Sequence, residues 1–291
     1  PARNPLKVFV LYKDDPYGEL LAEVIRTTLK FNGMDATLQQ VSGNFAIRVY
    51  EDVDASTDGV QPDPVAIQAA LDANPDAIFL IGTGEVGNIL ADIESQWASE
   101  GLAEEDRPFY FLADGGLANS TSEAAGAARN RIRGSIPGTS SPNFNAFTGL
   151  YQQAFPTGEF IGGPAVFGAA GAYDAVFLLA YSSVAAGDAP LTAAQLAAGF
   201  GKLINGTRTD VGSTSIGGAN STLQQGGTID FVGASGELQF DLTTGEAPSE
   251  IQIWCIPGGN MLGTASGIYY DGNVILGPPD PGDSMTFSCP F

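Results

Sequence analysis

The sequence contains no histidine among its 291 residues. Histidine is the usual general base near neutral pH and a common zinc ligand, so its absence excludes Ser/His/Asp and Cys/His nucleophilic arrangements. No GxSxG motif, phosphate loop or paired-carboxylate motif stands out in the chain. We therefore expect that the protein is not an enzyme and carries no cofactor, with a carboxylate-driven hydrolase as the remaining enzymatic alternative.

Basic residues are also scarce: twelve Lys and Arg stand against thirty-three Asp and Glu, which gives a formal net charge of −21. A chain of this charge repels phosphate backbones and anionic lipids, and it offers no basic stripe to bind either. The simplest consequence of so much negative charge is solubility. We therefore expect no nucleic-acid partner and no binding to membrane surfaces.

Cysteine occurs twice, at Cys255 and Cys289. The two residues could form a disulfide, which the chain-entropy model values at about 3–4 kcal/mol, or remain two buried thiols. A disulfide favours an oxidising compartment. We find no signal peptide and no apolar run of transmembrane length, which suits a mature secreted form or a chain that never had a leader. The expected location is periplasmic or extracellular, with a lipid anchor in the full-length form as one option.

The first residues predict a strand, a tight turn and an amphipathic helix. Leu6–Leu11 is apolar apart from one lysine, as a strand buried on both faces would be. Asp15 and Pro16 suit the N-cap and the first position of a helix whose apolar spacing continues to Gly33. In an open parallel sheet, the turn that follows a strand faces the ligand crevice. The residues placed there are Asp14, Asp15, Tyr17 and Gly18.

The same alternation continues through the first half of the chain. We predict strands at Met34–Val41, Ala77–Ile81, Pro108–Leu112 and Ile132–Ile136. Helices are predicted from Asp63 and Pro64, over Val86–Trp97 and over Ser122–Ala128, with a polar, acidic connection at Asn44–Pro62. Strands that alternate with helices predict an α/β fold with a parallel sheet and helices on both faces.

Three strand-to-helix turns should therefore line one edge of the sheet. They contain Tyr17, the stretch Thr83–Glu85, and Asp114 with Gly115. Thr83 and Gly84 could offer a hydroxyl and backbone N–H groups to a carboxylate. Glu85 could contact a ligand or simply suit the dipole of the helix that it begins.

The second half of the chain has a different character. Helices are predicted at Phe144–Phe155, Val166–Ala186 and Thr192–Ile204. Short strands with glycine turns follow, and their sequences are TIDFV, GELQFDL, EIQIWCI and GIYYDGNVIL. This half is expected to form a separate sub-assembly, and the crossing between the halves is a natural hinge.

Five segments of the chain follow one another in a characteristic order: DDPYGELLAEVIRTTLKFNG, ANPDAIFLIGTGE, FYFLADGG, GAYDAVFLLAYSSVAAG and GASGELQFDLTTGEAPSEIQIWCI. Together they resemble the type I periplasmic solute-binding proteins of ABC transporters, and most of all the branched-chain amino acid receptors. The resemblance spans residues 6–258. It implies a type I periplasmic-binding-protein-like fold, in which a parallel sheet flanked by helices forms the second lobe and hinge crossings lead to a partial first lobe.

The resemblance also implies a division of the chain. Residues 1–165 would form the second lobe, 166–245 the C-terminal part of the first lobe, and 246–291 the return strands and a C-terminal extension. Members of the family carry an N-terminal half-lobe before the segment that matches Leu6–Gly33, and only PARN precedes that match here. The chain is therefore expected to lack that half-lobe, as a fragment or after cleavage.

By position, the resemblance implies that the ligand-binding residues are Tyr17, Thr83, Gly84, Glu85, Asp114 and Gly115. Tyr17 would pack on the ligand or merely cover the start of its helix. Asp114 would pair with a ligand ammonium or cap the next helix. The segment ADGG departs from the turn of the branched-chain receptors, which leaves the register open by one residue.

The implied function is an extracytoplasmic receptor that captures a small polar ligand, an amino acid or small organic acid, for an ABC transporter permease. The alternative is the ligand-binding sensor domain of a signalling receptor. No metal is expected. Asp54, Ser56, Asp58 and Gly59 match the opening of a calcium loop, but Val65 stands where the bidentate glutamate should be.

Overall fold

The computed structural model describes residues 4–51, 63–137, 141–156, 168–187, 190–257, 264–270 and 275–276. The chain divides into two compact units. Unit 1 consists of Pro1–Ile136, Ile253–Ile268 and Pro278–Phe291, and unit 2 of Pro137–Gln252 and Tyr269–Gly277. The division into two lobes and a C-terminal extension that the sequence predicts stays a prediction.

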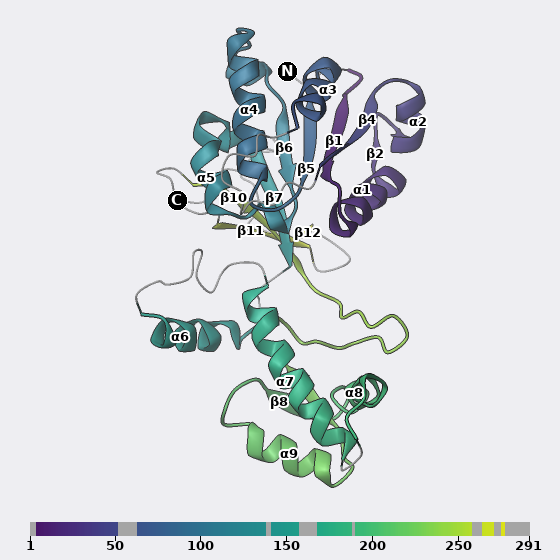
Figure 1. The fold of residues 1–291 in the computed structure, drawn as a ribbon, viewed down its shortest axis with the longest axis vertical. Coiled ribbons are helices and arrows are strands. Elements are labelled where there is room, and N and C mark those ends of the chain that lie inside the picture. Colours follow the sequence, from purple (N-terminus) through teal and green to yellow (C-terminus); the bar gives the residue numbers. More distant parts are fainter. Residues whose placement is uncertain are drawn as a thin grey trace. The chain divides into compact units, whose positions relative to one another are not determined.

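Unit 1 is built on a mostly parallel sheet flanked by helices (Figure 1). The complete sheet has the strand order β12-β11-β10-β7-β6-β5-β1-β4. Its strands are β1 (Val8–Lys13), β4 (Phe45–Tyr50), β5 (Ala77–Ile81), β6 (Phe109–Leu112), β7 (Ile132–Pro137), β10 (Ile251–Cys255), β11 (Thr264–Tyr270) and β12 (Ile275–Leu276). The neighbours β4, β1, β5, β6 and β7 pair in parallel, and β11 pairs with β12 antiparallel. These pairings confirm the predicted α/β fold with a parallel sheet.

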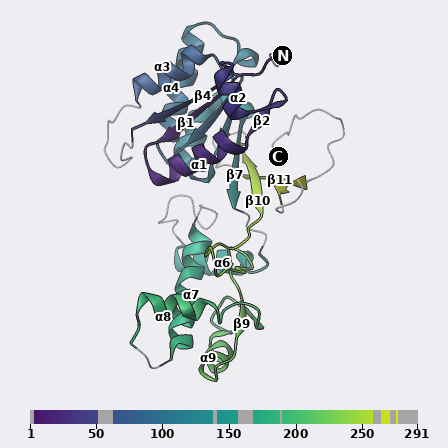
Figure 2. The same ribbon diagram turned by 90° about the vertical axis from the view of Figure 1, so that its right-hand side faces the viewer.

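Helices cover both faces of this sheet (Figure 2). The α-helices of the unit are α1 (Pro16–Thr28), α2 (Ala36–Val41), α3 (Pro64–Ala73), α4 (Val86–Ser99) and α5 (Asn119–Ala125). Short elements connect them: β2 (Lys30–Phe31), β3 (Met34–Asp35), and the 3-10 helices η1 (Glu104–Asp106), η2 (Asp114–Gly116) and η3 (Gly126–Arg131).

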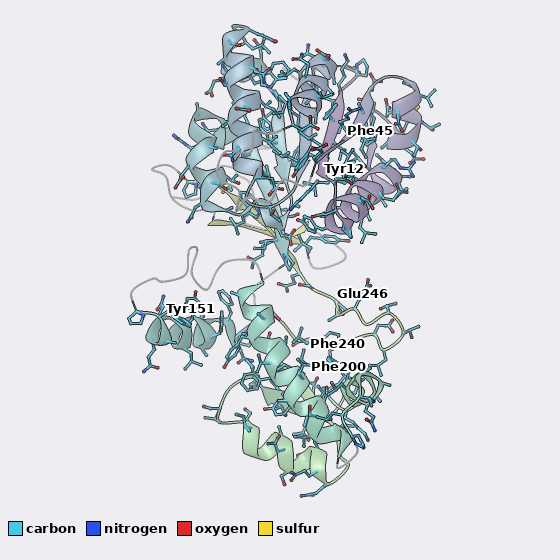
Figure 3. The ribbon with its side chains drawn as sticks, viewed as in Figure 1. Tyr12, Phe45, Tyr151, Phe200, Phe240 and Glu246 are labelled. Atoms are coloured by element: carbon cyan, nitrogen blue, oxygen red, sulfur yellow. The ribbon has the colours of Figure 1, made fainter. Side chains whose placement is uncertain are left out.

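Alternate residues of the central strands β1 and β5 enter two different clusters of apolar side chains. Leu11 and Leu80 pack with residues of α3 and α4, such as Ile67 and Ile93. Val10 and its neighbours on the other face pack with α1 and α2. Tyr12 and Phe45, labelled in Figure 3, belong to this second cluster. Because both faces of β1 and β5 are covered, these two strands are largely continuous apolar runs, which is why the sequence predicts them well.

Two helix starts form as the sequence predicts. The Asp15 carboxylate accepts a hydrogen bond from the Gly18 N–H at 2.7 Å, with Pro16 at the first helical position. Asp63 accepts from the N–H groups of Val65 and Ala66, at 2.9 and 3.2 Å, with Pro64 next in the chain. Both starts are determined by neighbouring residues alone.

The predicted strand at Met34–Val41 is wrong. Only Met34 and Asp35 are extended, as β3, and Ala36–Val41 forms the helix α2. The second strand of the sheet is instead β4, which lies in the segment that we expected to be a polar connection. In β4 only Phe45 and Tyr50 are buried, so its pairing with β1, rather than an apolar run, makes it a strand.

Besides the short strand β12, unit 2 contains four helices and a two-stranded parallel sheet among the residues that the structure describes. These elements are α6 (Phe144–Ala154), α7 (Ala169–Ala186), α8 (Ala193–Phe200), β8 (Thr207–Asp210), α9 (Ile216–Gln224) and β9 (Ile229–Val232). Neither β8 nor α9 was predicted, because one is short and polar and the other contains two glycines. The segment GELQFDL, which the sequence predicts as a strand, is not one in the structure. Its Phe240 ring packs edge-on against the Phe200 ring, with 5.6 Å between the ring centroids (Figure 3).

The expectation that no apolar run reaches transmembrane length is wrong for helix α7. By length and composition this helix could cross a membrane. Inside unit 2, however, Leu178 and Tyr181 of α7 pack in the core with Phe231. Core helices of soluble proteins pass the same composition test, so the criterion is weak evidence for a membrane span.

The predicted disulfide involves one residue that the structure describes. Cys255 ends β10 and is fully buried. Cys289 lies outside the described residues. The pairing of Cys255 with Cys289 therefore stays a prediction.

A buried carboxylate in α7 supports the loop after β9. Asp174 accepts hydrogen bonds from the N–H groups of Ala234 and Ser235, both at 2.7 Å, and from the Ser235 hydroxyl at 2.6 Å. Burial is the largest influence on Asp174 and raises its pKa, although these hydrogen bonds act in the opposite direction. Asp174 is thus a main support of the loop, together with the Ser141 hydroxyl, which donates to the Gly233 carbonyl oxygen at 2.6 Å.

We expect Asp174→Ala to lower the free energy of unfolding by about 2–3 kcal/mol, because the buried N–H groups of Ala234 and Ser235 would lose their acceptor. Denaturant unfolding followed by circular dichroism measures this loss, and amide hydrogen exchange locates it. Ser235→Ala, which removes one donor and leaves the carboxylate, should cost less. Equal losses in the two variants would contradict this assignment.

A second charged network ties α4 to the sheet of unit 1. Glu94 accepts from the Tyr110 hydroxyl at 2.6 Å, from Arg131 at 2.7 Å and from Arg107 at 3.1 Å. Burial is the largest influence and raises the pKa of Glu94, but the hydrogen bonds from Arg131 and Tyr110 help to outweigh it. The pKa therefore lies below its ordinary 4.5.

Because the pKa of Glu94 is lower in the folded protein than in the unfolded chain, the free energy of unfolding falls as the pH is lowered. The contribution of Glu94 is present above its unfolded pKa and is lost as the pH falls through its lower folded pKa. We expect Glu94→Gln to reduce the loss of unfolding free energy between pH 7 and pH 3, as measured by urea unfolding. The control is Glu23→Gln, because Glu23 pairs with Arg26 on the exposed surface, where such pairs contribute little. The same acid sensitivity in wild type and Glu94→Gln would refute the assignment.

Candidate functional site

The strand order creates a switch point in unit 1. From β1 the chain moves to β4 on one side and then crosses to β5 on the other side of β1. In open α/β sheets, ligands bind outside the carboxyl ends of the strands at such a point. The turns that follow β1 and β5 therefore flank the expected crevice, and the turn after β6 lies one strand further along.

Tyr17 and Asp114 connect two of these turns. The Tyr17 hydroxyl donates a short hydrogen bond to the Asp114 carboxylate, and the Gly115 N–H donates to the Tyr17 oxygen at 3.3 Å. Burial is the largest influence on Tyr17, and with the nearby Asp114 carboxylate it raises the tyrosine pKa well above its ordinary value. Tyr17 therefore stays a hydrogen-bond donor throughout the neutral range.

The hydrogen bond between Tyr17 and Asp114 helps to decide between the roles that the sequence leaves open for each of these residues. The ring of Tyr17 packs against the apolar cluster that contains Val10 and Phe45, and its hydroxyl hydrogen-bonds to Asp114 in the turn after β6. Asp114 does not cap the following helix, because α5 begins after Ala118. A ligand contact by either residue stays a prediction.

Gly115 brings the turn after β6 against the turn after β5. A Cβ atom added at Gly115 would lie 2.4 Å from the Gly82 carbonyl oxygen and 3.1 Å from the Thr83 methyl group. No side chain fits at that position without displacing backbone. The structure thus brings Tyr17, Thr83, Asp114 and Gly115 together, as the parallel sheet predicts.

Glu85 points into unit 1 and holds the turn after β5. Its carboxylate accepts from the Thr83 N–H at 2.9 Å, the Thr83 hydroxyl at 2.6 Å and the Tyr50 hydroxyl at 2.8 Å. The residue is 4% exposed. Burial is the largest influence and raises the pKa of Glu85, but the hydrogen bonds from Thr83 and Tyr50 help to outweigh it and the pKa is lowered. This geometry favours a supporting role for Glu85, and a direct ligand contact stays a prediction.

The turn after β5 is a poorer carboxylate site than the sequence suggests. Both the N–H and the hydroxyl proton of Thr83 are donated to Glu85. The Gly84 carbonyl oxygen accepts from the Ser120 hydroxyl at 2.7 Å. Asp15 and Asp114 add negative charge to the rim, by which we mean the turns that follow β1, β5 and β6. The Lys13 Nζ atom lies 3.6 Å from an Asp15 carboxylate oxygen. The rim therefore suits a hydrogen-bond donor or a cation better than an anion.

Sequence reasoning missed Tyr50 and Ser120. Tyr50 ends β4, and its hydroxyl also lies 3.0 Å from the Ile81 carbonyl oxygen. The available signal was FAIRVY at Phe45–Tyr50, which is rich in β-branched and aromatic residues between the polar Asn44 and Glu51. For Ser120 we see no signal in the sequence.

The calcium-like segment with Asp54, Ser56, Asp58 and Gly59 lies outside the described residues. Across the parts of the chain that the structure describes, no group of three or more acidic or cysteine side chains is arranged to hold a metal ion.

Comparisons with known proteins identify the fold. No family model and no curated protein sequence matches the chain. Among solved structures, a leucine-binding protein LivK from Thermotoga maritima has a TM-score of 0.56 at 16% identity, covering 94% of this chain and 62% of that protein. A type 1 periplasmic binding protein from Bordetella pertussis has a TM-score of 0.52 at 16% identity, with coverages of 88% and 60%. LivJ from Streptococcus pneumoniae, solved with isoleucine, has a TM-score of 0.51 at 16% identity, with coverages of 94% and 61%.

The chain therefore has the fold of the type I periplasmic binding proteins, which confirms the fold that the sequence predicts. It is similar to branched-chain amino acid binding proteins in architecture, at low sequence identity. The chain spans about three-fifths of the length of these proteins, as 60–62% coverage shows.

Adding one methyl group at Gly115 tests whether the turns after β5 and β6 are in contact. Gly115→Ala should lower the free energy of unfolding by about 1–3 kcal/mol, because the added Cβ would displace the Gly82 carbonyl. Gly84→Ala is the matched control from the neighbouring turn, since nothing lies within 4 Å of its added Cβ. Thermal and urea unfolding measure both effects, and equal stability of the two variants would show that the turns are not in contact.

Proposed function

We propose that the chain is the ligand-binding part of an extracytoplasmic solute receptor. Its ligand is a small molecule with a protonated amine, most simply an amino acid, and its partner is the permease of an ABC transporter. The observation that carries this proposal is the convergence of Tyr17, Thr83 and Asp114 at the switch point of the sheet. The periplasmic or extracellular location belongs to the same proposal.

Chemistry at the rim supports an amine-bearing ligand. Asp114 is partly buried, and one of its oxygens accepts from Tyr17. A carboxylate in this setting forms a charge-assisted hydrogen bond with an ammonium group that is stronger than a neutral one. The ring of Tyr17 beside it can cover the apolar part of a ligand. The similar folds named for leucine and crystallised with isoleucine agree with this ligand class.

A calorimetric screen of the amino acids, on the complete protein that carries this chain, tests the ligand class. At least one amino acid should bind, with heat proportional to occupancy. A screen in which no amino acid binds would contradict the ligand class, and one in which no small organic acid binds either would contradict the proposed solute receptor.

Two substitutions then test the site. Tyr17→Ala and Asp114→Ala should each weaken binding by about 1–3 kcal/mol, because each removes a direct contact. Tyr17→Phe separates the hydroxyl from the ring. Leu20→Ala is the control on the same helix, because that side chain is 69% exposed. Unchanged affinity in both alanine variants would remove Tyr17 and Asp114 from the binding site.

A further inference from the structure

Thr83 has a fixed hydrogen-bonding direction. A hydroxyl carries one proton, and the Thr83 oxygen lies 2.6 Å from a Glu85 oxygen. An ionised carboxylate can only accept, so the Thr83 proton points toward Glu85. The outward lone pairs of the Thr83 oxygen can therefore only accept a hydrogen bond.

Two features keep this direction from reversing. Glu85 is held ionised, since its pKa is lowered despite burial. Tyr50 is held protonated, since burial first and the Glu85 charge second raise its pKa. Tyr50 is 1% exposed, and its hydroxyl donates to Glu85 at 2.8 Å. Donor and acceptor roles are thus assigned along the whole path from Tyr50 to Thr83.

Gly82 shows how closely this network is packed. A Cβ atom at Gly82 would lie 1.9 Å from the Tyr50 hydroxyl and 2.5 Å from a Glu85 oxygen. The glycine therefore leaves room for the tyrosine from β4 to reach the carboxylate. Because Gly115 packs on the Gly82 carbonyl and the Thr83 methyl group, the network also sets the position of the turn that carries Asp114.

We infer that Tyr50 and Glu85 are positioning residues, which orient the Thr83 hydroxyl as an acceptor and so make the rim selective for ligands that present an ammonium group. This inference rests on the proposed function, and it names two residues that would not touch the ligand. Thr83 and Asp114 then present acceptors on adjoining turns, which an ammonium group satisfies and which a ligand without an N–H or O–H donor at that point leaves unpaired.

The decisive variant is Glu85→Gln. The glutamine amide can still accept from the Thr83 N–H, but its own NH2 group donates to the Thr83 oxygen and turns the hydroxyl proton outward. On the complete protein, calorimetry compares L-leucine with 4-methylpentanoate, which has the same carbon skeleton without the amine. We expect Glu85→Gln to weaken L-leucine binding by about tenfold and 4-methylpentanoate binding much less.

Substitutions at Thr83 show whether Glu85 acts through that hydroxyl. Thr83→Ser should keep the preference for the amine, and Thr83→Val should reduce it to the part that Asp114 supplies. In the Thr83→Val background, Glu85→Gln should cause no further loss of preference. An unchanged preference in Glu85→Gln, or its full effect in the Thr83→Val background, would overturn the inference.

Amide hydrogen exchange of the free protein tests the network without a ligand. The Thr83 amide should exchange slowly in the wild type and faster in Tyr50→Phe and Glu85→Ala. Rapid exchange in the wild type would show that the network does not form. If the wild type binds neither probe while its Thr83 amide is protected, the proposed ligand selectivity fails and the arrangement of the turn stands, whereas the proposed function is decided separately by the amino-acid screen.

Discussion

Parallel pairing of β1 with both β4 and β5 is the constraint on which the candidate site depends. It places the carboxyl ends of the central strands at one edge and opens a switch point between β1 and β5. The turns after β1, β5 and β6 are held there by the sheet. Tyr17 and Asp114, 97 positions apart in sequence, form a hydrogen bond as a result.

The same constraint shapes the chemistry of the rim. Tyr50 reaches Glu85 because β4 lies beside β1. A buried carboxylate without partners would be costly, and Glu85 is stable because three donors satisfy it. Those donors include both of the protons that Thr83 could have offered to a ligand. A rim that looks suited to an anion in the sequence is therefore a set of acceptors in the structure.

Much of the fold was predictable where the signal is local or continuous. The strand Ala77–Ile81 forms at its predicted residues, because a strand buried on both faces is an unbroken apolar run. Strand β4 was missed because most of its side chains are only partly buried or exposed. The segment around Phe240 was overpredicted for the opposite reason: its alternation is real, but no neighbouring strand pairs with it among the described residues.

The sequence by itself determined the helix starts at Asp15 and Asp63, the apolar strands, and the absence of histidine chemistry. Caps and apolar runs involve residues that are neighbours along the chain, so they need no further information. Only the tertiary structure decided that Glu85 faces Tyr50 and that Asp114 accepts from Tyr17. The physical reason is that hydrogen bonds between distant residues depend on strand order, and strand order is a property of the whole sheet rather than of any segment.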